Sequence, residues 1–317
     1  MRYSESMGTP ILWVGFNLLV LLALALDLGV FHRKAHKIKL GEAVFGSALW
    51  ITLALVFGWG IWHWHGEQRG LEYFTGYVIE KALSVDNLFV FLVIFRTFQV
   101  PEAVQHRVLA WGILGALVMR GVLIAAGAVL VARFQWILPA FGVFLVYTGL
   151  HMLWKREKAV HYEKNPIFRF ASSHLRVTKE YRGERFFLKD GGQLFATPLF
   201  LVLLIVEITD VTFAVDSIPA IFGITRDPFI VYTSNVFAIL GLRALYFLLA
   251  DVLDYFHYLG IGLAVVLMFI GGKMVADPWV HISVVLSLGA VGGTLLLAML
   301  ISVLTRPVKK KKEPGTG

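Results

Sequence analysis

The segment EKALSVDN at Glu80–Asn87 returns 130 residues later in altered form, as DVTFAVDS at Asp210–Ser217. In each copy an acid stands six residues before an Asp that follows a valine. Both copies lie within long apolar runs, where ionisable residues are rare and mark functional sites. We therefore expect two related helices that carry carboxylates into an apolar interior.

The repeat extends beyond these two segments. Arg120 and Arg243 stand in the middle of two later apolar runs, 123 residues apart, and YTGLHML (Tyr147–Leu153) aligns with FIGGKMV (Phe269–Val275) at an offset of 122. Each unit, at about 72–154 and 197–275, holds three predicted spans. Because three is odd, the second unit must enter the membrane from the opposite side. This is an inverted repeat, which is common in secondary transporters and places their site between the repeats.

Composition places the chain in a membrane. Its 317 residues are 58% hydrophobic and 16% charged, whereas soluble domains carry roughly a quarter charged residues. We predict an all-α, polytopic helix bundle that forms a single transmembrane domain over residues 1–317. Apolar runs of about 20 residues are long enough to cross the hydrocarbon core. We predict about nine transmembrane helices, at Ile11–Phe31, Val44–Trp64, Glu72–Phe95, Val108–Ala132, Trp136–Trp154, Thr197–Phe222, Phe229–Leu249, Leu259–Val275 and His281–Leu304.

Charge gives the orientation. With nine spans, the basic flank after the first span, the loop at about 155–196 and the tail at 305–317 fall on one face. The positive-inside rule makes that face cytoplasmic, so we expect a cell-membrane protein with its N-terminus outside. The net charge of +8 then reflects topology rather than nucleic-acid binding. The chain has no cysteine, no phosphate-binding loop, no nucleophile elbow and no HExxH motif, so we do not expect an enzyme or an ATP-driven pump.

Five carboxylates within the predicted spans form the candidate site. Each costs about 2.5–3.5 kcal/mol near the bilayer centre, so the set needs buried cations, protons or a metal ion as partners. Oxygen ligands without thiolate suit Mn²⁺, Mg²⁺ or Ca²⁺, and neighbouring side chains could add further oxygens. The predicted metal ligands are Glu80, Asp86, Glu207, Asp210 and Asp216, with Asn87 and Ser217 as additional oxygen ligands.

Helix geometry limits how these acids can meet. Glu80 and Asp86 are about 120° apart around an ideal helix, so they converge on one ion only if the helix is interrupted. Pro219, three residues after Asp216, is the expected kink. Arg120 and Arg243 offer another reading, as structural or gating partners that neutralise two acids. Five acids outnumber two arginines, so metal binding remains the favoured interpretation.

The motifs resemble the TerC family of integral membrane proteins, in particular its Alx-like branch. The resemblance covers nearly the whole chain, through the segments ALDLGVFHR (Ala25–Arg33), EKALSVDNLFVF (Glu80–Phe91), VEITDVTFAVDSIPAIF (Val206–Phe222) and TSNVFAILGLRALYF (Thr233–Phe247). It implies a fold related to the LysE superfamily of exporters and manganese export through the five acids named above. Glu207 has no acidic counterpart in the first repeat, where Tyr77 stands.

We therefore predict a metal cation exporter that moves Mn²⁺ out of the cytoplasm, with no organic cofactor and with the lipid bilayer as its surroundings. Proton exchange is the expected coupling, because a carboxylate that loses its cation in the membrane favours protonation. The alternative is a membrane-protein assembly or stress-response factor, as in tellurium resistance, that acts through its cytoplasmic loop. The sequence leaves open Mn²⁺ against Ca²⁺, the stoichiometry and the oligomeric state.

Overall fold

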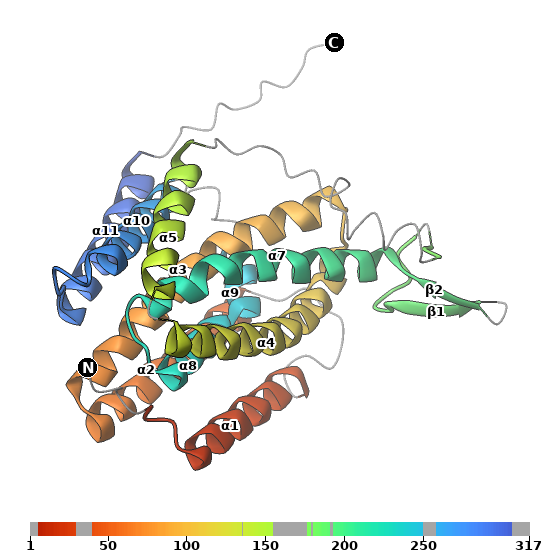
Figure 1. Ribbon diagram of the computed structural model, residues 1–317. Helices are drawn as coiled ribbons and strands as arrows, with labels where there is room; N and C mark the ends of the chain where they lie inside the picture. The colour runs from red at the N-terminus through yellow and green to blue at the C-terminus, as the bar shows by residue number, and fades with distance from the viewer. Residues whose placement is uncertain are drawn as a thin grey trace, which may run out of the picture.

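Helices make up most of the described chain, as the apolar runs predict (Figure 1). The computed structural model describes residues 6–29, 40–134, 136–154, 176–178, 180–190, 193–249 and 258–305. Its helices are α1 (Pro10–Gly29), α2 (Leu40–His65), α3 (Glu67–Thr97), α4 (Glu102–Arg133), α5 (Ile137–Trp154), α7 (Pro198–Phe222), α8 (Pro228–Ile239), α9 (Leu242–Leu249), α10 (Leu259–Ala276) and α11 (Val284–Leu304).

Six of the described helices are long and apolar enough to cross a membrane: α2, α4, α5, α7, α10 and α11. A seventh span results if α8 and α9, which bend by 41° at their junction, are counted as one. The prediction of about nine spans is therefore not confirmed. The described apolar part of α1 is only Pro10–Ala25, and α3 carries Glu80, Lys81 and Asp86 along its length.

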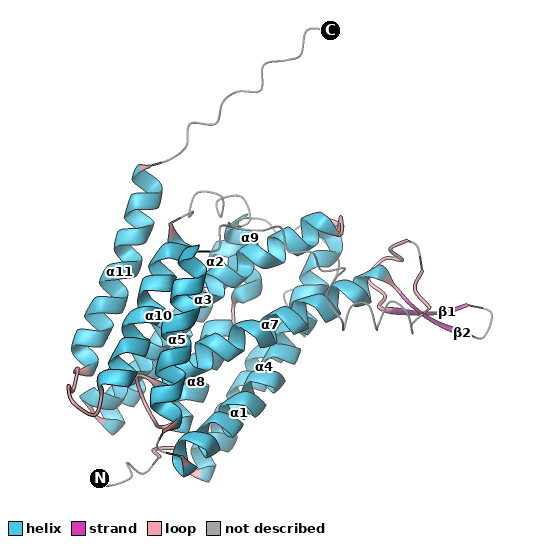
Figure 2. Ribbon diagram, turned by 45° about the horizontal axis from the view of Figure 1, so that its top comes forward, coloured by secondary structure: helices cyan, strands magenta, loops and turns pink. Residues whose placement is uncertain are grey.

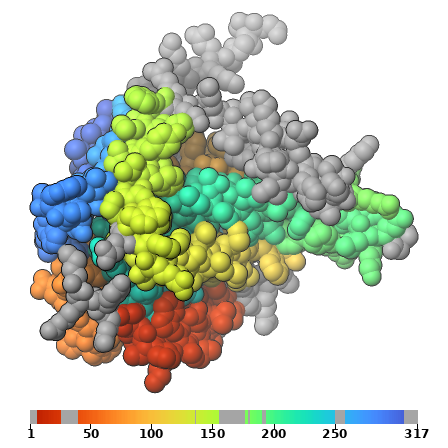
Figure 3. Space-filling view, viewed as in Figure 1, coloured from red at the N-terminus to blue at the C-terminus, as the bar shows by residue number. Residues whose placement is uncertain are grey.

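The helices from the two halves of the chain are interleaved. α3 packs mainly against α8, α4 against α7, and α5 against α10. Figures 1 and 2 both show α5 beside α10, with α11 on the far side of α10. α2 covers α3 and α9, and α1 lies along the edge of the bundle (Figure 3). The centre of the molecule is thus formed by segments that are far apart in sequence.

Glycines set the distance between α5 and α10. A Cβ atom on Gly271 would lie 2.5 Å from the carbonyl oxygen of Gly142, and one on Gly142 would lie 2.7 Å from that of Gly271. About two turns after Gly142, a Cβ on Gly149 would lie 2.7 Å from the carbonyl oxygen of Ala264. Small residues allow backbones to approach closely, which is how helices associate in lipid.

Polar and apolar side chains are distributed as lipid requires. On α4, Val118 and Val122 are 68% and 64% exposed, whereas Arg120 between them is 1% exposed. A charged side chain in the interior and large apolar side chains on the surface are expected where the solvent is hydrocarbon. The surface of α4 is therefore fitted to a bilayer.

The helix interruptions expected between Glu80 and Asp86 and at Pro219 are not where the structure has its break. α3 runs unbroken through Glu80 and Asp86, and α7 continues through Pro219 to Phe222. The break lies instead in the predicted span Phe229–Leu249, at Gly241, which has φ of +82°. Such a break leaves carbonyl groups of the last helical turn without amide partners. The Lys81 ammonium donates a hydrogen bond of 3.1 Å to the Ala238 carbonyl and so satisfies one of them.

The predicted cytoplasmic loop contains a small sheet. Strands β1 (Phe187–Asp190) and β2 (Gln193–Ala196) pair in antiparallel register, with Phe187 opposite Ala196. The hairpin projects from the end of α7, away from the helices (Figures 1 and 2). Residues 155–175 of the loop and the basic tail from 306 onward lie outside the described residues.

Candidate functional site

Arg120 reaches the centre of the bundle because one face of α4 is built to be buried. Gly112, Ala116, Arg120 and Ile124 recur every four residues and are all buried. Residues at this spacing share one helix face. The two small residues bring α4 close to α7, which leaves the longer arginine side chain to extend between the helices.

The Arg120 guanidinium contacts four polar side chains from three other helices. Nε and Nη2 donate to the two carboxylate oxygens of Asp210, at 3.1 and 3.0 Å, in a forked arrangement. Nη1 donates to Glu80 Oε1 and, at longer distances, to Asn235 Oδ1 (3.3 Å) and Ser217 Oγ (3.5 Å). We call these five residues the Arg120 centre. It joins α3, α4, α7 and α8 at one point.

Burial makes the charged side chains of the Arg120 centre energetically costly, because water cannot solvate them. Glu80 is fully buried and Asp210 is 4% exposed, so one guanidinium faces two carboxylates away from solvent. Two polar atoms here also lack a hydrogen-bond partner: Glu80 Oε2 and Asn235 Nδ2. Each such buried group costs about 1–3 kcal/mol. A small cavity of about 10 Å³ adjoins Asp210, lined on α4 by Gly112 and Ala116. The centre therefore has polar capacity that its own side chains do not use.

The other predicted acids lie apart from the Arg120 centre. Glu207 is half-buried, with its carboxylate against Gly115 of α4, where even a Cβ would collide with it. Asp216 is half-buried and accepts a hydrogen bond of 3.3 Å from Thr148 on α5. Asp86 is partly buried on α3. Within the described ranges, no group of three or more Asp, Glu, His or Cys residues is arranged to hold a metal ion.

The structure thus brings two of the five acids, Glu80 and Asp210, to a common partner. These are the repeat-equivalent acids of the two motifs. Of the other predicted site residues, Ser217 belongs to the Arg120 centre, Asn87 is buried on α3, and Arg243 is buried in the first turn of α9. The assignment of metal ligands remains a prediction.

The sequence reasoning missed Asn235 and Thr148. A signal for Asn235 exists in the polar run Thr233–Ser234–Asn235, which interrupts an apolar segment. All three side chains are buried, and the two hydroxyls donate to backbone carbonyls of their own helix. Only the amide of Asn235 is left to reach across to another helix.

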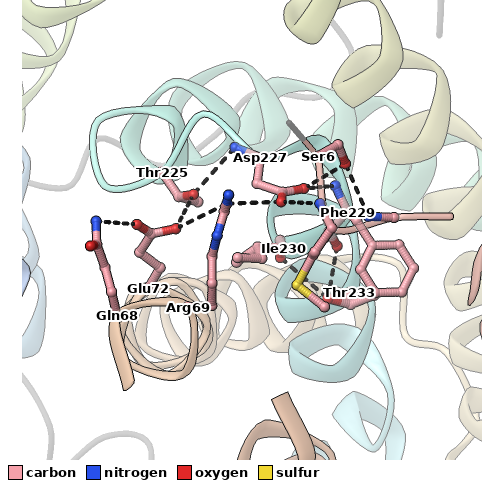
Figure 4. Close-up of polar contacts among 11 residues, drawn as sticks. Ser6, Gln68, Arg69, Glu72, Thr225, Asp227, Phe229, Ile230 and Thr233 are labelled. Carbon is pink, nitrogen blue, oxygen red and sulfur yellow. Dashed lines mark hydrogen bonds and ion pairs between the residues drawn. The ribbon is translucent and has the colours of Figure 1, made fainter. Parts of the chain in front are cut away.

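A second polar group lies at the end of the bundle where α2 meets α3, and it too was missed (Figure 4). Asp227, the N-cap of α8, has no exposed side-chain surface and accepts four hydrogen bonds. The donors are Arg69 Nη1 (2.9 Å), Phe229 N (2.9 Å), Ser6 Oγ (2.9 Å) and Met7 N (2.8 Å). We call Asp227 and its donors the Asp227 cluster. It ties the N-terminal segment to α3 and α8.

Glu72 links the Asp227 cluster to a polar pocket. Its carboxylate accepts from Thr225 Oγ1 at 2.6 Å and from Gln68 Nε2 at 3.2 Å (Figure 4). The pocket beside it has a volume of about 500 Å³ and also receives Lys273 and Asp277 from the end of α10. Apolar residues that line this pocket, among them Leu138 and Phe222, belong to the same buried cluster as Ile79, which directly precedes Glu80 in α3.

Comparison with known proteins identifies the family. Residues 65–311, which include both acidic motifs, match the Integral membrane protein TerC family. The chain belongs to the TerC family. The resemblance drawn from the motifs is therefore confirmed, and the protein is an integral membrane protein with several apolar spans.

Named relatives cover the TerC chain almost completely. An "Uncharacterized membrane protein STKORF319" from Myxococcus xanthus is 49% identical over 96% of this chain and 95% of its own length. The "Putative membrane-bound redox modulator Alx" of Escherichia coli K12 is 47% identical, over 94% of this chain and 96% of its own. A protein of the same name from Salmonella typhi is 46% identical over 97% and 98%. No solved structure matches the chain.

Proposed function

We propose that this TerC-family protein is a divalent metal cation exporter that moves Mn²⁺ out of the cytoplasm in exchange for protons. The observation that carries the proposal is the convergence of Glu80 and Asp210 on one buried cationic group. Both acids begin the repeated motifs, so a site between two repeats would contain them. Two carboxylates carry the charge that a divalent cation offsets, and their oxygens are the ligands Mn²⁺ prefers.

Reciprocal contacts support the inverted repeat that this proposal requires. Under the offset of 122 residues, Gly142 is equivalent to Ala264, and Gly149 is equivalent to Gly271. Gly142 contacts Gly271, and Gly149 contacts Ala264. These are the same contact made twice, once in each direction, which is what a twofold relation between α5 and α10 produces. The contacts of α3 with α8 and of α4 with α7 follow the same rule.

The proposed orientation follows from charge. The hairpin loop and the basic tail would face the cytoplasm, and the Asp227 cluster with its pocket would face the outside of the cell membrane. Under this arrangement the ion leaves the Arg120 centre toward the polar pocket, past the buried side chains around Ile79. No enzymatic reaction forms part of the proposal.

Metal flux tests the proposed function directly. Purified protein in proteoliposomes should carry Mn²⁺, and an imposed proton gradient should accelerate that flux. Glu80→Gln and Asp86→Asn should each reduce it at least about tenfold, equivalent to about 1.4 kcal/mol. Glu184→Gln is the matched control, because this acid lies outside the bundle in a partly exposed pair with Arg107. It should retain full flux.

Each outcome of the flux experiment bears on the proposal. Flux that ignores the proton gradient would remove the exchange mechanism and leave a metal transporter. Equal flux in wild type and both site variants would show that Glu80 and Asp86 do not take part in transport. No flux of Mn²⁺ or Ca²⁺ in wild type, beside an active control transporter, would refute transport.

A second candidate function rests on the hairpin β1–β2. This hairpin stands away from the helices and exposes Phe187 and Leu194, at 43% and 60%. Such an element suits a membrane-protein assembly or stress-response factor that contacts partner proteins through its loop. Replacement of the hairpin by a short Gly–Ser linker would then abolish function, whereas Glu80→Gln would be tolerated.

The relatives named Alx add the words "redox modulator". This chain has no cysteine, so thiol–disulfide exchange has no reactive group in it. Metal export can influence redox chemistry without such a group, because it changes how much redox-active metal the cytoplasm contains. The name of these relatives is therefore compatible with the proposed transport.

A further inference from the structure

We propose that Arg120 is a tethered counter-cation, which occupies the transport site when the metal is absent and must be displaced when the metal binds. This inference rests on the proposed function, and it assigns Arg120 a part in the cycle rather than a static one. In the arrangement described above, the two carboxylates are paired with a cation that belongs to the protein itself.

The contacts of Arg120 make its presence and that of a metal mutually exclusive. Its forked bonds engage both oxygens of Asp210, and Nη1 engages one oxygen of Glu80. Among the four carboxylate oxygens, only Glu80 Oε2 is left without a partner. A divalent cation takes about six oxygen ligands and cannot assemble them from one free atom. It would also lie beside a like charge in a buried site.

Charge counting gives the reason for an exchange. Glu80 and Asp210 together carry two negative charges when both are ionised, which a divalent cation offsets in full. After the metal leaves, two bare carboxylates in the membrane interior would be strongly unfavourable. Arg120 offsets one of these charges without leaving the protein, so the empty site can change conformation at a lower cost.

The hydrogen bonding of the Arg120 centre is also incomplete, unlike that of a purely structural ion pair. A buried pair that serves only stability is expected to have every polar atom hydrogen-bonded. Here Glu80 Oε2 and Asn235 Nδ2 are unsatisfied, and a cavity of about 10 Å³ adjoins Asp210. A space of that size holds about one water-sized particle. Glu80 Oε2 is thus an oxygen that could bind a cation, and a small space lies beside Asp210.

Metal binding to variants of the full chain tests this role. Isothermal titration with Mn²⁺ in detergent should give a dissociation constant at least about tenfold lower for Arg120→Gln than for wild type, because the competing cation is gone. Addition of Glu80→Gln to that variant should abolish the gain. Arg107→Gln is the matched control: it removes an arginine from the same helix, about 20 Å away, and should leave the constant unchanged. Flux should fall in Arg120→Gln, since a tightly held ion is released slowly.

The results separate failure of this inference from failure of the proposed function. Equal or weaker binding by folded Arg120→Gln, with wild type still transporting Mn²⁺, would overturn the inference alone. Neither binding nor flux in wild type would overturn both. If Arg120→Gln does not fold, Arg120→Lys provides the test, because lysine keeps the positive charge and leaves every oxygen of the site intact but cannot form the forked bonds to Asp210. It should tighten Mn²⁺ binding a few-fold, and unchanged or weaker binding would refute the inference.

Discussion

Replacement of Asp227 by alanine should destabilise the end of the bundle where α2 meets α3. The Asp227 side chain is fully buried, and its two oxygens accept hydrogen bonds from Arg69, Phe229, Ser6 and Met7. Truncation removes all four acceptor contacts at once. It also leaves the Arg69 guanidinium, which is 21% exposed, without its closest anionic partner.

The expected cost follows from these contacts. A hydrogen bond to a charged group contributes about 1.5–3 kcal/mol, and loss of an N-cap costs about 1 kcal/mol. Ser6 and Met7 lie near the surface and regain water, so their two bonds add little. The total is about 2.5–4 kcal/mol, which corresponds to a fall in melting temperature of about 5–10 °C in a protein of this size. Asp227→Asn should lose less, because asparagine still caps a helix well.

Thermal unfolding in detergent, followed by the fluorescence of the nine tryptophans, measures this effect. Asp277→Ala is the control, since this aspartate lines the same pocket but is 46% exposed and lies 3.6 Å from Arg226. A surface pair of this kind contributes about 0–1 kcal/mol. Similar shifts for the two alanine variants, or a shift below about 2 °C for Asp227→Ala, would refute the reasoning.

Two further predictions concern α10. Gly271→Leu should destabilise the protein by about 3 kcal/mol, because its side chain would enter the backbone of α5. The neighbouring Gly272→Ala should be nearly neutral, since nothing lies within 4 Å of its Cβ position, and equal melting temperatures for the two would contradict the argument. Lys273→Met should change stability by less than about 1 kcal/mol, because the amine's one hydrogen bond is to the Ser287 hydroxyl, which keeps a backbone acceptor. A chemical-denaturation loss above about 2 kcal/mol would show that Lys273 does more.

The helices could be predicted from sequence because lipid removes the alternatives. Backbone groups in hydrocarbon must be paired within the segment, so a long apolar run becomes a helix. The break at Gly241 could not be predicted in this way. A glycine in an apolar run is compatible with an intact helix. The feature that requires glycine here is the close approach of Trp50, which would lie 2.7 Å from a Cβ atom on Gly241 and belongs to a helix far away in sequence.

Two of the five predicted acids meet at the Arg120 centre, and the sequence did not indicate how they would be paired. The motif repeat identified Glu80 and Asp210, because carboxylates within apolar runs are conspicuous. The sequence offered Arg120 and Arg243 as equal partners. Only the rotation of α4 about its axis, together with its close approach to α7, decides that Arg120 joins these two acids.

The Asp227 cluster shows a different limit. Asp227 before Pro228 is a recognisable start of a helix, because Asp is a favoured N-cap and Pro is favoured at the first helical position. That pattern predicts a local bond to Phe229, which the structure contains. It carries no information about Arg69 or Ser6, which are distant in sequence and meet Asp227 only in the folded chain.

Glu80 and Lys81 are consecutive residues on α3, and each is bonded to a different element. Glu80 is bonded to Arg120 of α4, and Lys81 is bonded to the Ala238 carbonyl beside the bend between α8 and α9. Because α3 carries the acceptor of one bond and the donor of the other, a rotation or shift of α3 alters both bonds. The ion pair at the Arg120 centre and the hydrogen bond that supports the bend therefore both depend on the position of α3.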